Sequence, residues 1–180
     1  MHLWQPADSV TIHAHGDARR VHLNTRMRAS VLLMTQLLLE PAAPRITHLA
    51  LGNGIGSGTL ALPEAPNTDR QTMLSEFVRV PITTIAYDDL ENQQGDTYSD
   101  GSRSNRVLVH TEVPLAQASA LITEVALFGG YDADEDESGT IFAWSTFPVI
   151  DNRAGGDDPE APKDLVFDWV LKFPFISIEE

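Results

Sequence analysis

Two apolar runs, Ile122-Thr-Glu-Val-Ala-Leu-Phe128 and Ile141-Phe-Ala-Trp-Ser-Thr-Phe147, lie at the centre of residues 121–150. Each has the length of a strand and is rich in β-branched and aromatic residues. The segment between them, Gly129-Gly-Tyr-Asp-Ala-Asp-Glu-Asp-Glu-Ser-Gly139, is polar and bounded by glycines. This order predicts an antiparallel hairpin that is closed by an acidic, solvated loop.

A third run, Leu165-Val-Phe-Asp-Trp-Val-Leu-Lys-Phe-Pro-Phe175, has large apolar residues at every odd position. Its even positions include Asp168 and Lys172. A period of two over this length is typical of a strand with one buried face and one face at least partly in water. We expect this closing strand to pair with the central hairpin.

The N-terminal region predicts a hairpin followed by a helix. Residues 10–15 and 18–23 form two short runs around Gly16-Asp17, which is a tight-turn signal. Residues 25–39 then predict a helix, with Asn24-Thr25 as its cap and Pro41 and Pro44 after its end. The apolar positions that share one helical face are Met27, Val31, Met34 and Leu38, and Leu33 and Leu37 widen that face.

Further strands are predicted at residues 46–51, 77–87 and 106–113, with a break at Pro81 and a short helix at residues 72–76. The fold class is therefore mainly β: an antiparallel β-sandwich with one N-terminal α-helix and a short N-terminal hairpin. Residues 1–23 would form an assembly arm, and residues 24–180 would form the helix and the sandwich.

Composition excludes several classes of partner. The chain has 180 residues, 12 of them basic and 26 acidic, which gives a net charge of −14. Nucleic acid and anionic membranes attract clustered Lys and Arg, so neither is an expected partner. The longest apolar block, residues 31–39, is much shorter than the ~20 residues of a membrane span. The absence of cysteine removes disulfides and thiolate metal sites.

The acidic loop is the clearest candidate for binding a metal ion. Asp132, Asp134 and Asp136 have the opening pattern of a calcium-binding loop, but Glu137 stands where that loop needs glycine, and Ala143 stands where it needs a bidentate glutamate. The two interpretations are an irregular calcium site and a solvated acidic loop.

Other candidate sites are weaker. His13 and His15 share one face of a predicted strand and could contribute to a metal site, or they are polar residues on an exposed face. The glycines of residues 52–58 lead into a proline-rich loop, so they predict a tight turn and not a phosphate site. No serine has a nucleophile context and cysteine is absent. We therefore expect no enzyme and no cofactor.

Taken in order, short motifs resemble the N-terminal domain of phage tail-collar fibre proteins, a group found in phage tails and related contractile injection systems. The resemblance covers roughly residues 25–175. Its motifs are the apolar helix at 25–39, Ile46-Thr-His-Leu-Ala-Leu-Gly-Asn-Gly54, Leu74-Ser-Glu-Phe-Val-Arg-Val-Pro-Ile82, Glu124-Val-Ala-Leu-Phe128, Gly139-Thr-Ile-Phe-Ala143, Phe147-Pro-Val-Ile150 and Leu165 with Trp169-Val-Leu-Lys-Phe173.

The resemblance implies a non-catalytic structural component of a tail: a collar, a baseplate or a fibre-attachment adaptor. Such a protein would assemble in the host cytoplasm, reside in the virion, and bind copies of itself and neighbouring tail proteins. We expect the hairpin and the helix to dock on an adjacent subunit or tail protein; the alternative is that the hairpin folds back on its own sheet. The candidate interface residues are Trp4, Val10, Ile12, Val21, Leu23, Val31 and Leu38.

Two other hypotheses remain open. The first is a receptor- or glycan-binding module that uses the acidic loops at 88–105 and 131–139. The second is a metal-dependent hydrolase that acts through His13 and His15.

Overall fold

The computed structural model describes residues 9–14, 17–23, 25–27, 29–40, 45–54, 71–88, 104–135, 138–155 and 162–173. Its elements are β1 (Ser9–Ala14), β2 (Asp17–Leu23), β3 (Thr25–Arg26), α1 (Ala29–Leu39), β4 (Ile46–Gly52), β5 (Glu76–Pro81), β6 (Thr84–Tyr87), β7 (Arg106–Val113), α2 (Leu115–Ala118), β8 (Leu121–Gly129), β9 (Thr140–Asp151) and β10 (Leu165–Lys172).

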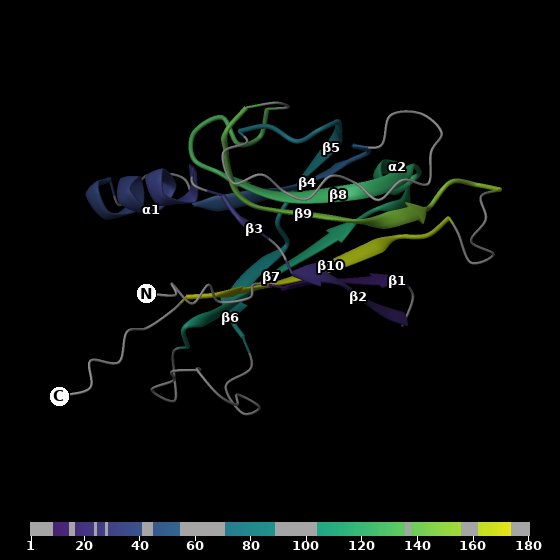
Figure 1. Cartoon of the computed structure of the whole chain (residues 1–180), viewed down its shortest axis with the longest axis horizontal. Helices are drawn as coiled ribbons and strands as arrows, with labels where there is room; N and C mark the ends of the chain where they lie inside the picture. The colour runs from purple at the N-terminus through teal and green to yellow at the C-terminus, as the bar shows by residue number, and fades with distance from the viewer. Residues whose placement is uncertain are drawn as a thin grey trace, which may run out of the picture.

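The fold is mainly β and consists of two antiparallel sheets, which form two layers in Figure 1. Sheet A has the strand order β2-β1-β10-β7-β6, and sheet B has the order β3-β9-β8-β4-β5. Side chains from both sheets form one shared core, which buries them away from water. Its largest members include Ile12, Phe167 and Trp169 from sheet A and Leu49, Leu127 and Phe147 from sheet B.

The central hairpin is confirmed. Strands β8 and β9 pair antiparallel from Leu121 opposite Asp151 to Gly129 opposite Thr140. The alternation of the closing strand is also confirmed, because Leu165, Phe167 and the next two odd positions of β10 are buried.

The expected pairing of the closing strand with the central hairpin is wrong. Strand β10 lies in the other sheet, between β7 and β1. Strand β8 has β4 and β9 on its two edges, and the outer edge of β9 pairs with the short β3 at Ala143 and Trp144. The closing strand therefore packs across the core from the hairpin and does not extend its sheet.

The N-terminal hairpin is confirmed as a pair of strands, and it lies against its own sheet, so the docking predicted through Val10 and Ile12 is wrong. Strand β1 pairs with β10, from Ser9 opposite Val170 to His13 opposite Val166. Val10 is 0% exposed and Ile12 is 1% exposed, both in the shared core. A two-stranded hairpin is marginal by itself, and here the open edge of β10 supplies its partner within the same chain. Val10 and Ile12 are therefore core residues and are not free for a neighbouring subunit.

Three details of the elements differ from the predictions. The helix begins at Ala29, because Thr25–Arg26 pairs with β9 and Met27 donates a backbone hydrogen bond to Phe142. Residues 72–76 form no helix; they approach the end of β4, where Asn53 donates a hydrogen bond to the Ser75 carbonyl. The break at Pro81 is confirmed and is larger than expected, since β5 before it belongs to sheet B and β6 after it belongs to sheet A.

Candidate functional site

Sheet B carries a second cluster of buried apolar side chains. Alternation along β8 places Val125 and Leu127 in the shared core and Ala126 and Phe128 in this second cluster. The remaining members are Met27, Ala50, Met73, Ala133, Ile141 and Trp144, with Leu74 packed against them. Several of these residues come from segments outside the sheet. Within the described part of the chain, the second face of sheet B is therefore covered by irregular segments and not by another sheet.

A buried carboxylate attaches one of these covering segments to the sheet. Glu124 on β8 is 0% exposed, and it accepts hydrogen bonds from the backbone of Leu74 (3.1 Å) and Ser75 (2.8 Å) and from the indole of Trp144 (3.0 Å). The end of β4 must approach this carboxylate closely. A Cβ atom at Gly52 would overlap Glu124 and lie 2.7 Å from the Ser75 carbonyl oxygen, so glycine is needed there.

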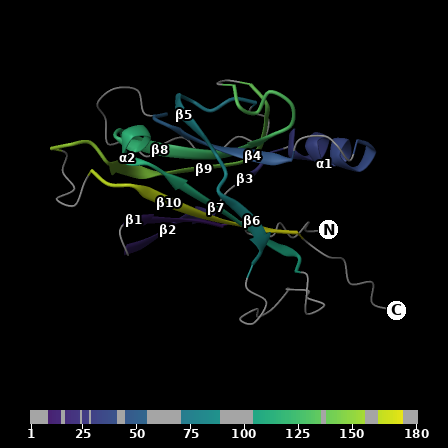
Figure 2. The ribbon, with the colours of Figure 1, turned by 180° about the vertical axis from the view of Figure 1, so that it is seen from behind.

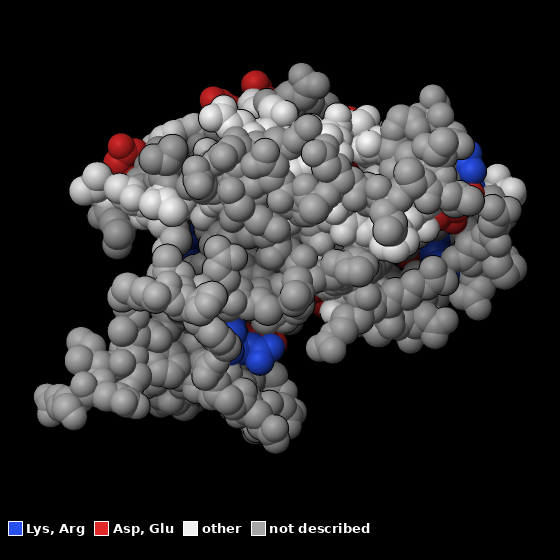
Figure 3. Space-filling view, in the orientation of Figure 1, with Lys and Arg blue, Asp and Glu red and all other residues white. Residues whose placement is uncertain are grey.

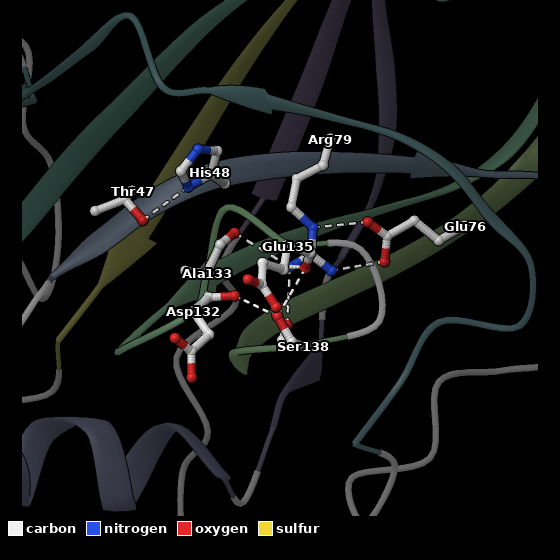
Figure 4. Close-up of polar contacts among 8 residues, drawn as sticks. All are labelled: Thr47, His48, Glu76, Arg79, Asp132, Ala133, Glu135 and Ser138. Carbon is white, nitrogen blue, oxygen red and sulfur yellow. Dashed lines mark hydrogen bonds and ion pairs between the residues drawn. The ribbon is translucent and has the colours of Figure 1, made fainter.

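A buried arginine organises the acidic loop after β8 (Figure 4). Arg79 on β5 forms a two-pronged ion pair with Glu76, at 2.6 and 2.7 Å, and the two side chains are only 2% and 6% exposed. Its third nitrogen donates to the carbonyl oxygens of Ala133 (3.1 Å), Glu135 (2.6 Å) and Ser138 (2.8 Å). The guanidinium also lies 3.7 Å from the centre of the Phe128 ring.

The side chains of Tyr131, Asp132, Asp134 and Glu135 are exposed, as expected of a solvated loop, but the backbone of the loop is held from inside. Three carbonyl groups of the loop accept hydrogen bonds from a cationic group, and that group is the guanidinium of Arg79 on β5. Ala133 is 3% exposed and lies within the second cluster, while the Ser138 hydroxyl donates back to the Asp132 carbonyl. Asp132 has φ of 60°, which any residue except glycine, asparagine or aspartate tolerates poorly. The loop backbone is therefore held in place by hydrogen bonds and by the packing of Ala133.

The predicted calcium ligands that the structure describes have side chains exposed to solvent. Asp132 and Asp134 are exposed, and Asp136 is outside the described residues. Across the parts of the chain that the structure describes, no three His, Asp or Glu side chains come together in a way that could hold a metal ion.

His48 lies beside the loop on the neighbouring strand β4, next to Thr47 (Figure 4). Burial lowers the pKa of His48. Asp134 acts to raise this pKa, and Arg79 acts to lower it. His48 therefore favours its neutral form at the edge of the acidic loop.

Among the described side chains of helix α1, one side is buried against the fold and another is exposed. Leu33 is 1% exposed and packs at the end of β8, where a Cβ atom on Gly129 would lie 2.7 Å from its side chain. Three apolar residues of the same helix face water: Val31 is 62% exposed, Met34 is 40% exposed and Leu39 is 78% exposed. In both ribbon views the helix extends beyond the ends of the strands (Figures 1 and 2). Val31, one of the candidate interface residues, and Met34 therefore point away from the sheets.

The loop and the helix meet at one polar contact. The Tyr131 hydroxyl donates to the Glu40 carboxylate at 3.4 Å, and Tyr131 itself is 55% exposed. The described exposed charges at this end of sheet B are Glu40, Asp132, Asp134 and Glu135, with Arg45 as the opposing charge. In the space-filling view, a group of white atoms lies at the α1 end of the visible face, and red acidic atoms lie beside it (Figure 3).

The other predicted site residues are only partly placed. Val21 and Leu23 lie on β2, Leu38 lies on α1 and His13 lies on β1, but the side chains of these residues are outside the description. Trp4, His15 and residues 55–58 of the glycine run also lie outside it. Of the candidate interface residues, Val31 is therefore the one whose side chain the structure describes as exposed.

The exposed face of sheet A holds an ionisable pair that sequence reasoning missed. The His110 Nδ1 lies 2.6 Å from a carboxylate oxygen of Asp168, and its Nε2 lies 3.5 Å from Glu112. The hydrogen bond to Asp168 is the main influence and raises the pKa of His110; partial burial opposes it, and Glu112 adds to it. Alternation along the closing strand predicts that Asp168 lies on the more exposed face. The sequence does not show that β10 pairs with β7, which places His110 opposite Asp168.

Comparison with protein-family models and with curated proteins finds no match for this chain. Within the described residues, no helix has both the length and the apolar character that a membrane span requires.

We predict that Arg79→Met will destabilise the protein by about 3–5 kcal/mol, because it leaves Glu76 as a buried unpaired charge and removes the donor from three carbonyl groups. Urea unfolding measures this change. The matched control is Arg153→Met, which removes an arginine that is 53% exposed and paired with Asp151. That control should cost less than about 1 kcal/mol. Equal effects of the two substitutions would contradict the structural role of Arg79.

The His110 pair predicts a pH dependence of stability. A raised pKa means that the folded protein binds the proton more tightly than the unfolded chain does. The stabilisation is therefore complete below about pH 6.5 and is lost as the pH rises through the raised value. Unfolding free energies of the wild type and His110→Gln should differ more at about pH 5.5 than at about pH 8.5. Asp168→Asn should remove most of that difference. A larger difference at alkaline pH would contradict this assignment.

Proposed function

We propose that this protein is a structural component of a phage or phage-like tail, acting in a collar, a baseplate or a fibre-attachment adaptor. It works through protein–protein assembly and without catalysis. Its two antiparallel sheets form a β-sandwich that carries an N-terminal helix and hairpin. Support comes from the ordered sequence motifs, from Ile46 to Phe173, that resemble the tail-collar fibre domain, and from the mainly β fold in which they lie.

The observation that carries this proposal is the uncovered apolar side of α1. Residues 29–39 include no charged residue, and an 11-residue helix is marginal in water by itself. Its polar residues are Ser30, Thr35 and Gln36, and a helix with so many apolar residues is normally buried over most of its surface. Here Leu33 anchors one side, while Val31 and Leu39 are more than half exposed. A surface of this kind favours a protein that is completed by another macromolecule.

A second candidate function is recognition of a receptor or glycan through the acidic loop. One observation favours it: Tyr131 exposes more than half of its surface beside Asp132 and Asp134, on a loop that Arg79 holds in one conformation. An aromatic ring with fixed polar neighbours is a plausible starting point for recognition. The hydrolase hypothesis based on His13 and His15 gains no supporting contact from the described residues.

The proposal extends to assembly and location. We place the protein in the virion tail, assembled in the host cytoplasm, as a symmetric homo-oligomer that contacts neighbouring tail proteins. The net charge of −14 favours contacts with protein surfaces over contacts with nucleic acid or anionic membranes. Symmetric assemblies repeat one set of contacts, which a stable two-sheet unit can supply.

Electron microscopy of particles tests the function. Antibodies against the purified protein should label one fixed position on tails from a culture that produces the protein. Light scattering of the purified protein should give a mass that is a whole multiple of 19.7 kDa and more than one copy. Protein that is found only free of particles, and that stays monomeric at all concentrations, would reject the proposal.

A further inference from the structure

The exposed side of α1 has a defined border. Its apolar residues are Val31, Met34 and Leu39. The helix ends at Leu39, and Glu40 follows directly and accepts the hydrogen bond from Tyr131. The acidic loop thus begins beside the C-terminal end of the helix. We call the described exposed apolar and acidic residues of the helix and the loop together the α1 surface: Val31, Met34, Leu39, Glu40, Tyr131, Asp132, Asp134 and Glu135.

Among the described residues, the exposed charge around the α1 surface is mainly negative. The exposed carboxylates described there belong to Glu40 and to the loop residues Asp132, Asp134 and Glu135, and the described exposed base is Arg45. Arg79 does not neutralise these surface carboxylates, because its charge is paired with Glu76 and both side chains are buried. Arg79 holds three carbonyl groups of the loop and so fixes the backbone from which the loop carboxylates project. A partner must therefore meet fixed negative charge around an apolar centre.

We propose that the α1 surface docks a basic amphipathic helix of another protein, with the partner's apolar stripe on α1 and its Lys or Arg side chains toward the acidic border. This inference rests on the proposed function and names the chemistry of the neighbouring protein. Helix recognition by an apolar surface is a common binding mode, and a complementary charged rim sets its specificity. A second copy of this chain fits less well, because it brings another −14 charge and the same acidic border.

Fluorescence anisotropy with a labelled Leu/Lys peptide of amphipathic helical pattern tests the proposal on the full chain. We expect saturable binding, weaker at higher salt because the border charges are screened. The same pattern built from Leu and Glu should not bind. The Val31→Gln/Leu39→Gln variant keeps the net charge and the helix propensity, and it should weaken binding by about tenfold or more. The matched control is Ile85→Gln on β6, a 46% exposed residue in sheet A, with less than about twofold effect.

A charge variant separates the acidic contribution to binding from the apolar one. Glu40→Gln/Asp132→Asn removes two border charges while keeping the shapes, and asparagine tolerates the positive φ at position 132. It should weaken binding of the Leu/Lys peptide and flatten its salt dependence. Circular dichroism should show the same helix and sheet content in every variant.

Three results would overturn the proposal. The first is equal binding of the Leu/Glu peptide. The second is full binding by the Val31→Gln/Leu39→Gln variant. The third is a wild-type mass, measured by light scattering, that falls to the monomer value in that variant, since this would assign the α1 surface to a second copy. Labelling of tails without peptide binding rejects this inference alone, whereas peptide binding without tail labelling rejects only the tail function.

Discussion

Strand β8 is buried along both of its faces, and the layers around it follow from that constraint. Its residues Val125 and Leu127 meet the side chains of sheet A, which closes the shared core. Its residues Ala126 and Phe128 point the other way, where no second sheet lies among the described residues. Irregular segments must cover that side, and irregular segments bring backbone groups that need hydrogen bonds. The distinctive chemistry of this protein lies in how those groups are satisfied.

Two charged side chains satisfy them. Glu124 accepts from the backbone of the covering segment at Leu74 and Ser75, and Arg79 donates to the carbonyl groups of the loop after β8. Hydrogen bonds with a charged partner are stronger than neutral ones, so each residue fixes a segment that has no regular structure of its own. The consequence extends to the surface, because the loop that Arg79 holds presents its carboxylates beside the uncovered side of α1.

Much of the strand content could be predicted from the sequence, because alternation is a local property. The odd positions from Leu165 to Leu171 show it without any knowledge of their neighbours. Strand pairing is not local: the sequence could not show that β10 lies between β7 and β1, and so it missed both the burial of Ile12 and the pair of His110 with Asp168. The helical pattern likewise predicted a helix, but its orientation depends on Leu33 fitting against Gly129.

The candidate site had a signal that was available in the sequence. Glu124 and Arg79 each stand alone as a charge within an apolar strand run. A charge in that position is rarely buried unless it is paired or hydrogen-bonded, so each one predicts a specific polar partner. The identity of that partner could not be predicted. The partners include the backbone groups of Ser75 and Glu135, and every residue has such groups, so the residue types do not reveal which ones are used.

Hydrogen–deuterium exchange tests most directly whether β8 is the stable centre and α1 is an element that awaits a partner. Amides of β8 should exchange only through global unfolding, because both faces of the strand are buried. Amides of α1 should exchange much faster in the free protein and should become protected when the Leu/Lys peptide is bound. Amides of α1 that are already as protected as those of β8 in the free protein would contradict this account.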